Sequence, residues 1–299
     1  MNVVQCNDLT KVYGRKAAVN NITVRIEENK ITGLIGRNGA GKTTLLKMIA
    51  GYYTKSSGEV LVFNEDPFNN LQVSSNLIFI DDNMTFPISY TLKDILKTAA
   101  TFYEHWDGKL ATGLFNYFQL DKDQYHDKLS KGMKSTFNMI IGLSARCPLT
   151  IFDEPTTGMD AAVRKDFYRA LLKDYLNHPR TMILSSHLLN EIEDVLEDVL
   201  LIKEGEKCLH LPIEQLKQYA VGLSGQEQAV TEATANADVI YQEKIGPNGL
   251  YVAVKNNYSD HELEQFKLKG IEVKSVSTTD VCVYLTNRNQ GGIDDVFQR

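Results

Sequence analysis

The segment Gly36–Thr43, which reads Gly-Arg-Asn-Gly-Ala-Gly-Lys-Thr, constrains the fold more than any other part of the sequence. It has a glycine, four free positions and then Gly-Lys-Thr, which is the pattern of a loop that binds phosphate groups. The apolar run Ile31–Ile35 predicts a short buried strand before it, and Thr44–Ala50 predicts a helix after it that ends at Gly51. This order of strand, glycine loop and helix favours a P-loop over an ordinary glycine-rich turn.

The chemistry of triphosphate binding gives roles to the residues of this loop. Glycines let backbone N–H groups curve around phosphates without a clashing Cβ, and the following helix directs its positive end at them. We expect Lys42 to reach the β- and γ-phosphates of ATP and the Thr43 hydroxyl to bind Mg²⁺. The candidate nucleotide-binding residues in and beside the loop are Gly36, Asn38, Gly39, Gly41, Lys42, Thr43 and Thr44.

Composition limits the class of protein without naming a function. The 299 residues suffice for one large domain and a smaller one, or for two medium domains. The net charge of −6 argues against a nucleic-acid partner, which needs a basic face. No apolar run approaches the roughly 20 residues of a membrane span, and Met1–Gln5 lacks the features of a secretory signal. The scattered cysteines predict reduced thiols in a cytosolic protein.

The apolar periodicity predicts strands alternating with helices, which indicates an α/β fold with a mostly parallel sheet covered on both faces. Strict alternation in Ile22–Glu27 predicts a strand with one solvent-exposed face. From Pro87 to Leu143 the pattern is helical, so we expect a helical insertion, about residues 84–147, between two core strands. The other elements predicted are strands at Val3–Leu9, Gly58–Phe63, Asn76–Ile80, Leu149–Phe152, Thr181–Ser185 and Asp198–Lys203, and helices at Ala161–Tyr175 and Leu188–Leu196.

The sequence changes in character beyond Gly205. Residues 224–238 are small and polar, which predicts a linker or a weakly ordered stretch. We expect a small accessory α/β domain over residues 221–299, whose role in dimer contact, regulation or capping the sequence leaves open. Its predicted elements are a hairpin of Val239–Lys244 and Leu250–Val254, a helix at Ser259–Leu268, and short strands at Ile271–Ser275 and Val281–Leu285.

A second anion-binding feature lies at Leu129–Met133, upstream of the strand that ends in Asp153-Glu154. Ser130 is a natural N-cap, and the residues after it predict a helix. A second helix N-terminus therefore offers N–H groups and a hydroxyl to an anion. Because one triphosphate does not need two such sites, the sequence predicts two chains that face each other head to tail, each closing over the nucleotide of the other.

Together these segments resemble the nucleotide-binding subunits of ABC transporters over residues 1 to about 220. The resemblance implies a P-loop NTPase cassette with a parallel sheet core, an antiparallel β subdomain and a helical subdomain. It also implies binding and hydrolysis of ATP with Mg²⁺. The matching motifs, in the family's order, are Gly36–Thr43 (Walker A), Leu129–Met133 (signature), Leu149–Glu154 (Walker B), Gly158–Asp160 (D-loop) and His187 (switch histidine).

The resemblance assigns roles to residues that their position alone leaves open. Taken singly, Tyr13 could be a packed tyrosine, the carboxylates a solvated surface, and His187 an incidental loop histidine. Within the family pattern Tyr13 stacks on the adenine, Asp153 holds Mg²⁺ and Glu154 is the base that deprotonates the attacking water. The remaining implied contacts are those of His187 with the γ-phosphate, of Ser130 and Gly132 with the nucleotide of the other subunit, and of Asp160 at the dimer seam.

The sequence departs from the family pattern at two places. In the signature, Lys131 replaces the first glycine and Met133 replaces a glutamine. The form Leu-Ser-Lys-Gly-Met-Lys, preceded by Trp106-Asp107, resembles a bacterial branch linked to export or to resistance against peptides and antibiotics, and suggests phenol-soluble-modulin exporters. A glutamine expected after Asn76–Ile80 is missing, and we align Asp82 with it as a further Mg²⁺ ligand.

The resemblance also predicts partners. We expect a homodimer or heterodimer of ATPase subunits that works with separate transmembrane permease subunits, lies peripherally on the inner face of the cell membrane, and binds no nucleic acid. The segment Tyr90–Tyr103 is the expected socket for the permease, although internal packing explains its apolar stripe equally well. The alternatives are an importer ATPase with a C-terminal regulatory domain and a soluble ABC ATPase outside transport.

Overall fold

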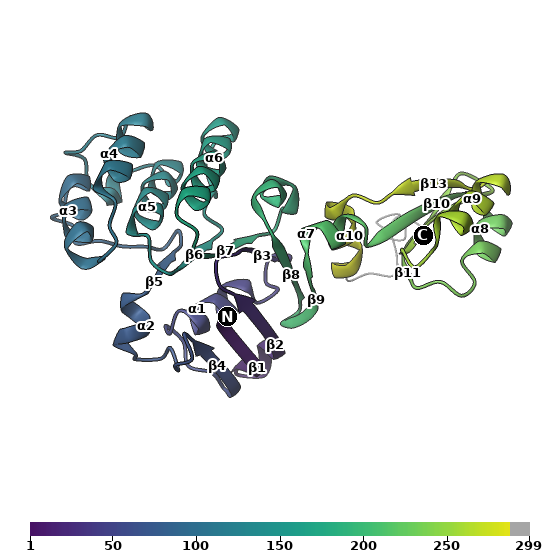
Figure 1. Ribbon diagram of the computed structural model, residues 1–299, viewed down its shortest axis with the longest axis horizontal. Coiled ribbons are helices and arrows are strands. Elements are labelled where there is room, and N and C mark those ends of the chain that lie inside the picture. The colour runs from purple at the N-terminus through teal and green to yellow at the C-terminus, as the bar shows by residue number, and fades with distance from the viewer. Residues whose placement is uncertain (288–299) are drawn as a thin grey trace. The chain divides into compact units, whose positions relative to one another are not determined.

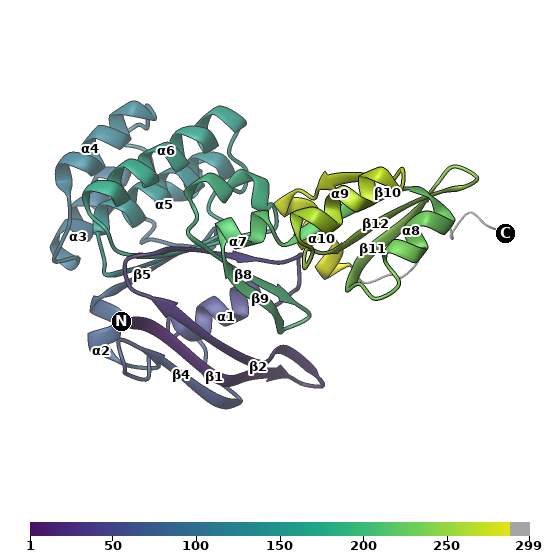
Figure 2. The same ribbon diagram turned by 45° about the vertical axis from the view of Figure 1, so that its right-hand side comes forward.

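The computed structural model describes residues 1–287, shown in Figures 1 and 2. The chain divides into two compact units, Met1–His210 and a second that begins at Leu211. No helix among residues 1–287 is both long and apolar enough to cross a membrane. The expected functional boundary after residue 220 stays a prediction, because compactness alone does not show which residues a function needs.

The first unit contains two sheets. Its antiparallel sheet has the strand order β2 (Lys16–Glu27), β1 (Asn2–Tyr13), β4 (Ser57–Val62). Its six-stranded sheet has the order β5 (Leu77–Ile80), β6 (Leu149–Asp153), β7 (Thr181–Ser186), β3 (Ile31–Ile35), β8 (Asp198–Lys203), β9 (Glu206–Pro212). The pairs from β5 to β8 are parallel. All residues of β3 and β6 are buried, as expected for a parallel sheet covered on both faces.

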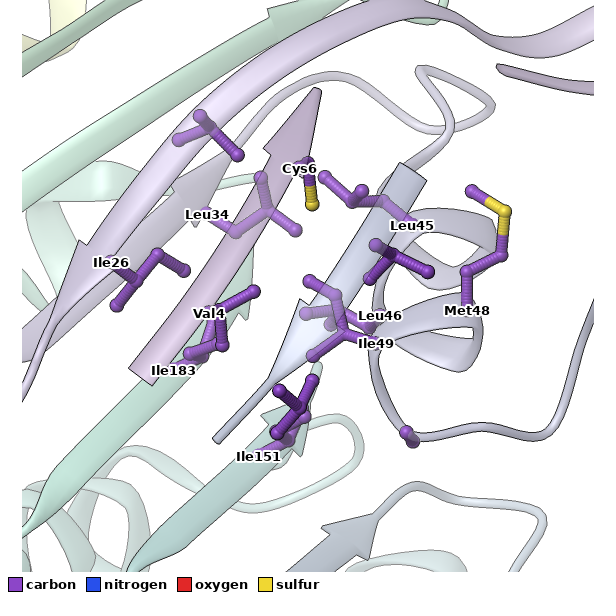
Figure 3. Close-up of a cluster of buried hydrophobic side chains, with 14 of the residues drawn as sticks. Val4, Cys6, Ile26, Leu34, Leu45, Leu46, Met48, Ile49, Ile151 and Ile183 are labelled. Atoms are coloured by element: carbon purple, nitrogen blue, oxygen red, sulfur yellow. The ribbon is translucent and has the colours of Figure 1, made fainter. Parts of the chain in front are cut away.

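Helix α1 (Lys42–Ile49) lies between these two sheets, as Figure 2 shows. Its side chains Leu45, Leu46 and Ile49 are at most 1% exposed, so their apolar surface is almost entirely removed from water. Each such side chain contributes about 1.5–3 kcal/mol by burial, which fastens the helix after the glycine loop to both sheets. Figure 3 shows the cluster around them, which includes Val4, Cys6 and Ile26 of the antiparallel sheet and Leu34, Ile151 and Ile183 of the parallel one.

Helices between β5 and β6 form the expected helical subdomain. Of these, α5 (Lys131–Ala145) covers the other face of the parallel sheet together with α6 (Ala161–Asn177), and the remaining helices pack on α5 (Figures 1 and 2). Their starts are fixed by side chains that cap the backbone. Thr91 and Asp94 form a capping box, and Asp107, Ser130 and Asp160 cap the next three helices. The helices are α3 (Leu92–Phe102), α4 (Gly108–Tyr117), α5 (Lys131–Ala145) and α6 (Ala161–Asn177), with the short α2 (Leu71–Ser75) before β5.

Between helix α7 (Ile213–Lys217) and helix α10 (Thr278–Thr286), the second unit has the element order strand, helix, strand, strand, helix, strand. Its antiparallel sheet has the order β11, β12, β10, β13, which is the split βαβ or ferredoxin-like arrangement. Leu223, Val252 and Val254 point into its core with Val230 of α8. The elements are α7 (Ile213–Lys217), β10 (Ala220–Gln226), α8 (Glu227–Ala233), β11 (Val239–Ile245), β12 (Gly249–Lys255), α9 (Asp260–Leu268), β13 (Glu272–Ser275) and α10 (Thr278–Thr286).

Two predictions for the second unit are wrong. Residues 224–238 are not a linker, because Ser224–Gln226 continues β10 and pairs with β12, and α8 buries Val230. The small and polar residues Ser224, Gly225 and Gln226 therefore take part in strand pairing. The predicted strand Val281–Leu285 is part of helix α10. Ser277 caps this helix by accepting from the Asp280 N–H, and this cap outweighs the strand preference of the β-branched residues.

The predicted helix Leu188–Leu196 is also wrong. The segment forms two 3₁₀ turns, η2 (Leu189–Glu191) and η3 (Glu193–Val195). Leu189, Ile192 and Val195 are buried at a spacing of three residues, which fits a 3₁₀ turn as well as an α-helix. The sequence periodicity could not distinguish the two.

Gly142 allows α5 to pack directly on the parallel sheet. A Cβ at this position would lie 2.7 Å from the Phe152 ring and 2.8 Å from the Ile80 side chain. We predict that Gly142→Ala lowers the free energy of unfolding by about 1–3 kcal/mol, because buried neighbours must move. Urea unfolding followed by the fluorescence of the single tryptophan, Trp106, measures this.

The matched control is Gly113→Ala on the exposed face of helix α4, where a Cβ meets nothing within 4 Å. We expect this variant to gain about 0.5–1 kcal/mol, because alanine is the better helix former. Equal stability of the two variants would contradict the close packing of α5 on the sheet.

Candidate nucleotide-binding site

The glycine loop between β3 and α1 follows a path that only glycine permits at its critical points. Gly41, the N-cap of α1, has φ +103°, and a Cβ there would lie 2.2 Å from the Ala18 carbonyl oxygen. At Gly36 a Cβ would lie 2.6 Å from the Ile202 carbonyl oxygen. The loop is therefore pressed between the antiparallel sheet and β8, with no room for a side chain at either glycine.

A cavity of about 380 Å³ opens above this loop, within the size range of ligand sites. It brings together most of the predicted nucleotide-binding residues with one predicted catalytic carboxylate, Glu154. A larger cavity of about 620 Å³ lies elsewhere in the first unit, lined by residues such as Phe63 and Arg146 that have no part in the predicted chemistry. The smaller cavity is lined by Tyr13, Lys16, Ala18, Asn38, Gly39, Ala40, Gly41, Lys42, Thr43, Thr44 and Glu154.

Lys42 is the central charge of the cavity, and its side chain is only 6% exposed. Its Nζ donates a hydrogen bond of 2.7 Å to the Gly36 carbonyl and lies 3.1 Å from Glu154 Oε1. The second contact is an ion pair without hydrogen-bond geometry, since Oε1 accepts no hydrogen bond within the described residues. A buried ammonium needs such partners because burial removes its hydration.

Asp153 and Glu154 follow one another at the carboxyl end of β6. Burial raises the pKa of the Asp153 carboxyl above its ordinary value, while hydrogen bonds from the hydroxyls of Ser185 and Thr43 lower it. Glu154 has φ +48°, which turns its side chain away from that of Asp153 toward Lys42. The two neighbouring carboxylates thus face different partners.

Ser185 on β7 joins these two acids. Its hydroxyl donates to Asp153 Oδ1 at 2.5 Å and accepts from the Glu154 N–H at 2.9 Å. Ser185 is not among the residues that the sequence predicts for the site, because its contact depends on the parallel pairing of β6 with β7. A serine near the end of a buried strand next to the Asp-Glu strand was the available signal.

His187 lies just beyond β7 and completes this side of the site. Its Nδ1 is 2.9 Å from Glu154 Oε2, and its side chain is 44% exposed. Glu154 therefore stands between a buried cation and an imidazole. A carboxylate in this position can orient a water molecule and accept its proton.

The oxygen ligands suited to a metal ion are the Thr43 hydroxyl and the Asp153 carboxylate, and the Thr43 hydroxyl lowers the pKa of that carboxyl. Within residues 1–287 there is no group of three or more His, Cys, Asp or Glu side chains that could hold a metal alone. This fits Mg²⁺, which keeps several waters and is bound by one or two protein groups plus phosphates. Asp82, the other predicted ligand, instead lies 3.4 Å from Lys131 Nζ.

Ser130, Gly132 and Asp160 form a separate group. Ser130 caps α5 by accepting from the Met133 N–H, and Asp160 caps α6 by accepting from two backbone N–H groups. A Cβ at Gly132 would lie 2.4 Å from the Gly158 carbonyl oxygen, so the start of α5 presses on the loop that leads to Asp160. These residues do not line the cavity over the glycine loop.

The fold and the site together define a class. Strand β3 of the parallel sheet leads through a glycine loop into a buried helix, and the lysine of that loop faces the acidic pair at the end of β6. This is the architecture of P-loop nucleotide-binding proteins.

Comparisons with known proteins narrow this class to a family. The family model for ABC transporters matches residues 19–157. The chain is 30% identical over 309 residues to YcbN, an uncharacterized ABC transporter ATP-binding protein of Bacillus subtilis (strain 168), covering 99% of this chain and 95% of that protein. This chain therefore belongs to the ABC transporter ATP-binding proteins.

Two further likenesses agree with this assignment. The bacitracin transport ATP-binding protein BcrA of Bacillus licheniformis is 27% identical over 287 residues, covering 93% of this chain and 94% of that protein. A solved structure described as a dimeric, post-hydrolysis state of an ATP-binding cassette with ADP and Pi matches with a TM-score of 0.60 at 20% identity, covering 70% of this chain and 98% of that one. At that identity the solved structure shows the fold.

We predict that Ser185→Ala moves the acidic limb of the pH profile of ATP hydrolysis to higher pH. The change removes a hydrogen bond that lowers the pKa of Asp153, so this carboxylate, the expected Mg²⁺ ligand, becomes protonated at a higher pH. It also leaves the Glu154 N–H without its partner, at a cost of about 1–3 kcal/mol in stability. Steady-state turnover between pH 5 and pH 9 measures the shift.

Ser144→Ala is the control, because the buried Ser144 hydroxyl has no hydrogen-bond partner within the described residues. Its pH profile is expected to match that of the unaltered protein. Identical acidic limbs for Ser185→Ala and Ser144→Ala would show that Ser185 does not act on Asp153.

Proposed function

We propose that this chain is the ATP-binding and hydrolysing subunit of a bacterial exporter. The proposed hydrolysis rests on the position of Glu154, which lies between Lys42 and His187 and lines the cavity over the glycine loop. Membership of the ABC transporter ATP-binding proteins supports it.

Hydrolysis of ATP is mostly positioning and neutralisation of charge. The backbone of Gly36–Thr43 and the Lys42 ammonium hold the β- and γ-phosphates. Glu154 orients and deprotonates the attacking water, and His187, exposed at the edge of the site, hydrogen-bonds the γ-phosphate. Tyr13 stacks on the adenine at the other end of the cavity.

Mg²⁺ supplies positive charge that neutralises the β- and γ-phosphate oxygens. Thr43 and Asp153 would hold it, and their hydroxyl and carboxylate oxygens suit its preference for oxygen ligands. Burial raises the pKa of the Asp153 carboxyl, and its ionised form would be favoured beside a bound cation.

Two chains complete each site in this proposal. Ser130, Gly132 and Asp160 lie outside the cavity that Lys42 faces, and a neighbouring copy or related chain can present its Ser130 helix end to the bound γ-phosphate. The dimeric description of the matched cassette structure supports this arrangement. Loss of the γ-phosphate then separates the two chains, which is the switch that drives transport.

The transported substrate is proposed from the relatives. BcrA is named for bacitracin transport, and the signature form of this chain suggests amphipathic peptides, toxins or drugs, phenol-soluble modulins among them. Separate membrane subunits carry the substrate, and this chain lies peripherally on the cytoplasmic face. A hollow of about 360 Å³ lined by Asp82–Ile88 and Tyr90, with Ile88 85% exposed, is the proposed dock for them.

We predict that Glu154→Gln lowers ATP turnover about 10²- to 10⁴-fold, because the amide cannot accept the proton of the attacking water. ATP binding persists, and the variant stays dimeric with ATP for longer than the unaltered protein. Phosphate release and size-exclusion chromatography with light scattering measure the two effects.

Glu59→Gln on the exposed strand β4 is the control and is expected to leave turnover unchanged. Full turnover in Glu154→Gln would rule out Glu154 as the base. A strictly monomeric ATP-loaded variant, even beside its membrane subunit, would rule out the two-chain site.

We predict that Ile88→Asp removes most of the co-purifying membrane subunit from detergent-solubilised membranes, while ATP binding by the isolated chain is unchanged. A charge on this exposed apolar side chain disfavours burial against a partner. The control is Leu176→Asp near the end of α6, where the leucine is 69% exposed. Undiminished co-purification of Ile88→Asp would place the permease elsewhere on the chain.

A further inference from the structure

A second tyrosine, which the sequence motifs do not assign, contacts the ring of Tyr13 from outside the residues that line the cavity. Tyr13, at the end of β1, lines the cavity and is 48% exposed. The ring of Tyr53 meets it edge-on, with centroids 6.4 Å apart and planes at 80°. We infer that Tyr53 is a positioning residue that holds the Tyr13 ring in place for stacking on the nucleotide base. This inference rests on the proposed function of Tyr13.

Tyr13 needs such support because of where it lies. It is the last residue of β1, and the chain turns back at Gly14, which has φ +58°. The backbone beyond Tyr13 therefore does not pack against its ring. A half-exposed ring that rotates freely loses conformational freedom when a base stacks on it, and that loss weakens binding. An edge-to-face aromatic contact is favourable in itself and reduces that loss by fixing the ring beforehand.

Tyr53 is held firmly by helix α1. The N–H groups of Tyr52 and Tyr53 both donate to the Lys47 carbonyl, at 2.8 and 3.1 Å. The Lys47 ammonium lies 5.8 Å from the centre of the Tyr53 ring and 3.4 Å from Asp81 Oδ2, which fixes the cation over that ring. The helix that begins at the phosphate loop thus holds Tyr53, which lies just beyond its end, through the Lys47 carbonyl and side chain.

The segment after Tyr53 is also fastened to the strand that carries Tyr13. Lys11 Nζ donates to the Thr54 carbonyl at 2.6 Å and lies 5.3 Å from the centre of the Tyr13 ring. The Ser56 N–H donates to the Thr10 carbonyl at 2.8 Å. These bonds set the distance between β1 and the segment, so the contact of the two rings is built into the fold.

The neighbouring Tyr52 provides a matched control. It is 58% exposed, against 39% for Tyr53, and its ring packs edge-on against Phe79 with centroids 5.4 Å apart. Loss of either ring removes a similar amount of aromatic surface from the same segment. Only loss of Tyr53 removes the ring that meets Tyr13.

The experiment compares the affinities of the full chain for Mg–ATP and for inorganic tripolyphosphate, which has no base. Tyr53→Ala is expected to weaken ATP binding about three- to tenfold and to leave tripolyphosphate binding unchanged. Tyr53→Phe keeps the ring and is expected to bind ATP like the unaltered protein. Tyr52→Ala is expected to change neither affinity. If Tyr53→Ala does not fold, Tyr53→Leu removes the ring and keeps apolar bulk.

A double variant separates positioning from general loosening of the site. Tyr13→Ala alone is expected to weaken ATP binding but not tripolyphosphate binding, and adding Tyr53→Ala to it is expected to have no further effect. Equal loss of both ligands in Tyr53→Ala, or a loss that adds to that of Tyr13→Ala, overturns the positioning role. A loss in Tyr13→Ala without one in Tyr53→Ala overturns this inference alone. Unchanged ATP affinity in Tyr13→Ala overturns the stacking role on which it rests.

Discussion

The buried ammonium of Lys42 is the constraint on which the rest of the site depends. At 6% exposure it has lost most of its hydration, and charge and hydrogen-bond partners must replace it. The Gly36 carbonyl comes from its own loop, but Glu154 comes from the end of β6. One charge therefore requires the loop after β3 and the end of β6 to converge, across the intervening β7. The left-handed backbone at Glu154, stabilised by its N–H bond to Ser185, provides that convergence.

Close backbone contacts at glycines fix the positions of the loops of the site relative to one another. Gly41 lets the phosphate loop touch the antiparallel sheet at Ala18, the residue that also lines the nucleotide cavity. Gly132 lets the start of α5 touch the loop at Gly158, and Ser135 on the next turn donates to the Thr157 carbonyl at 2.9 Å. Because close-packed interiors transmit strain, we expect a shift of the loop after Glu154 to reach the Ser130 end of α5.

The sequence was most informative where function depends on residues that are close along the chain. Gly36–Thr43 with its flanking strand and helix, and the strand ending in Asp153-Glu154, were predictable because each motif contains its own structural context. Ser185 and Tyr53 were not, since their roles come from contacts with residues distant along the chain. The strand predicted at Val281–Leu285 failed because one capping serine outweighed local strand preference, and caps are weak signals beside apolar periodicity.

The two departures from the family pattern meet each other in space. A lysine at the first position of a helix opposes the helix dipole, and Lys131 occupies that position in α5. Asp82, which we align with the expected glutamine, lies 3.4 Å from its ammonium and offsets the charge. Both side chains are about half exposed, so the pair adds little to the stability of the fold. Its consequence is electrostatic: the nearby ammonium of Lys131 makes the Asp82 carboxylate attract a cation less strongly than an unpaired carboxylate would.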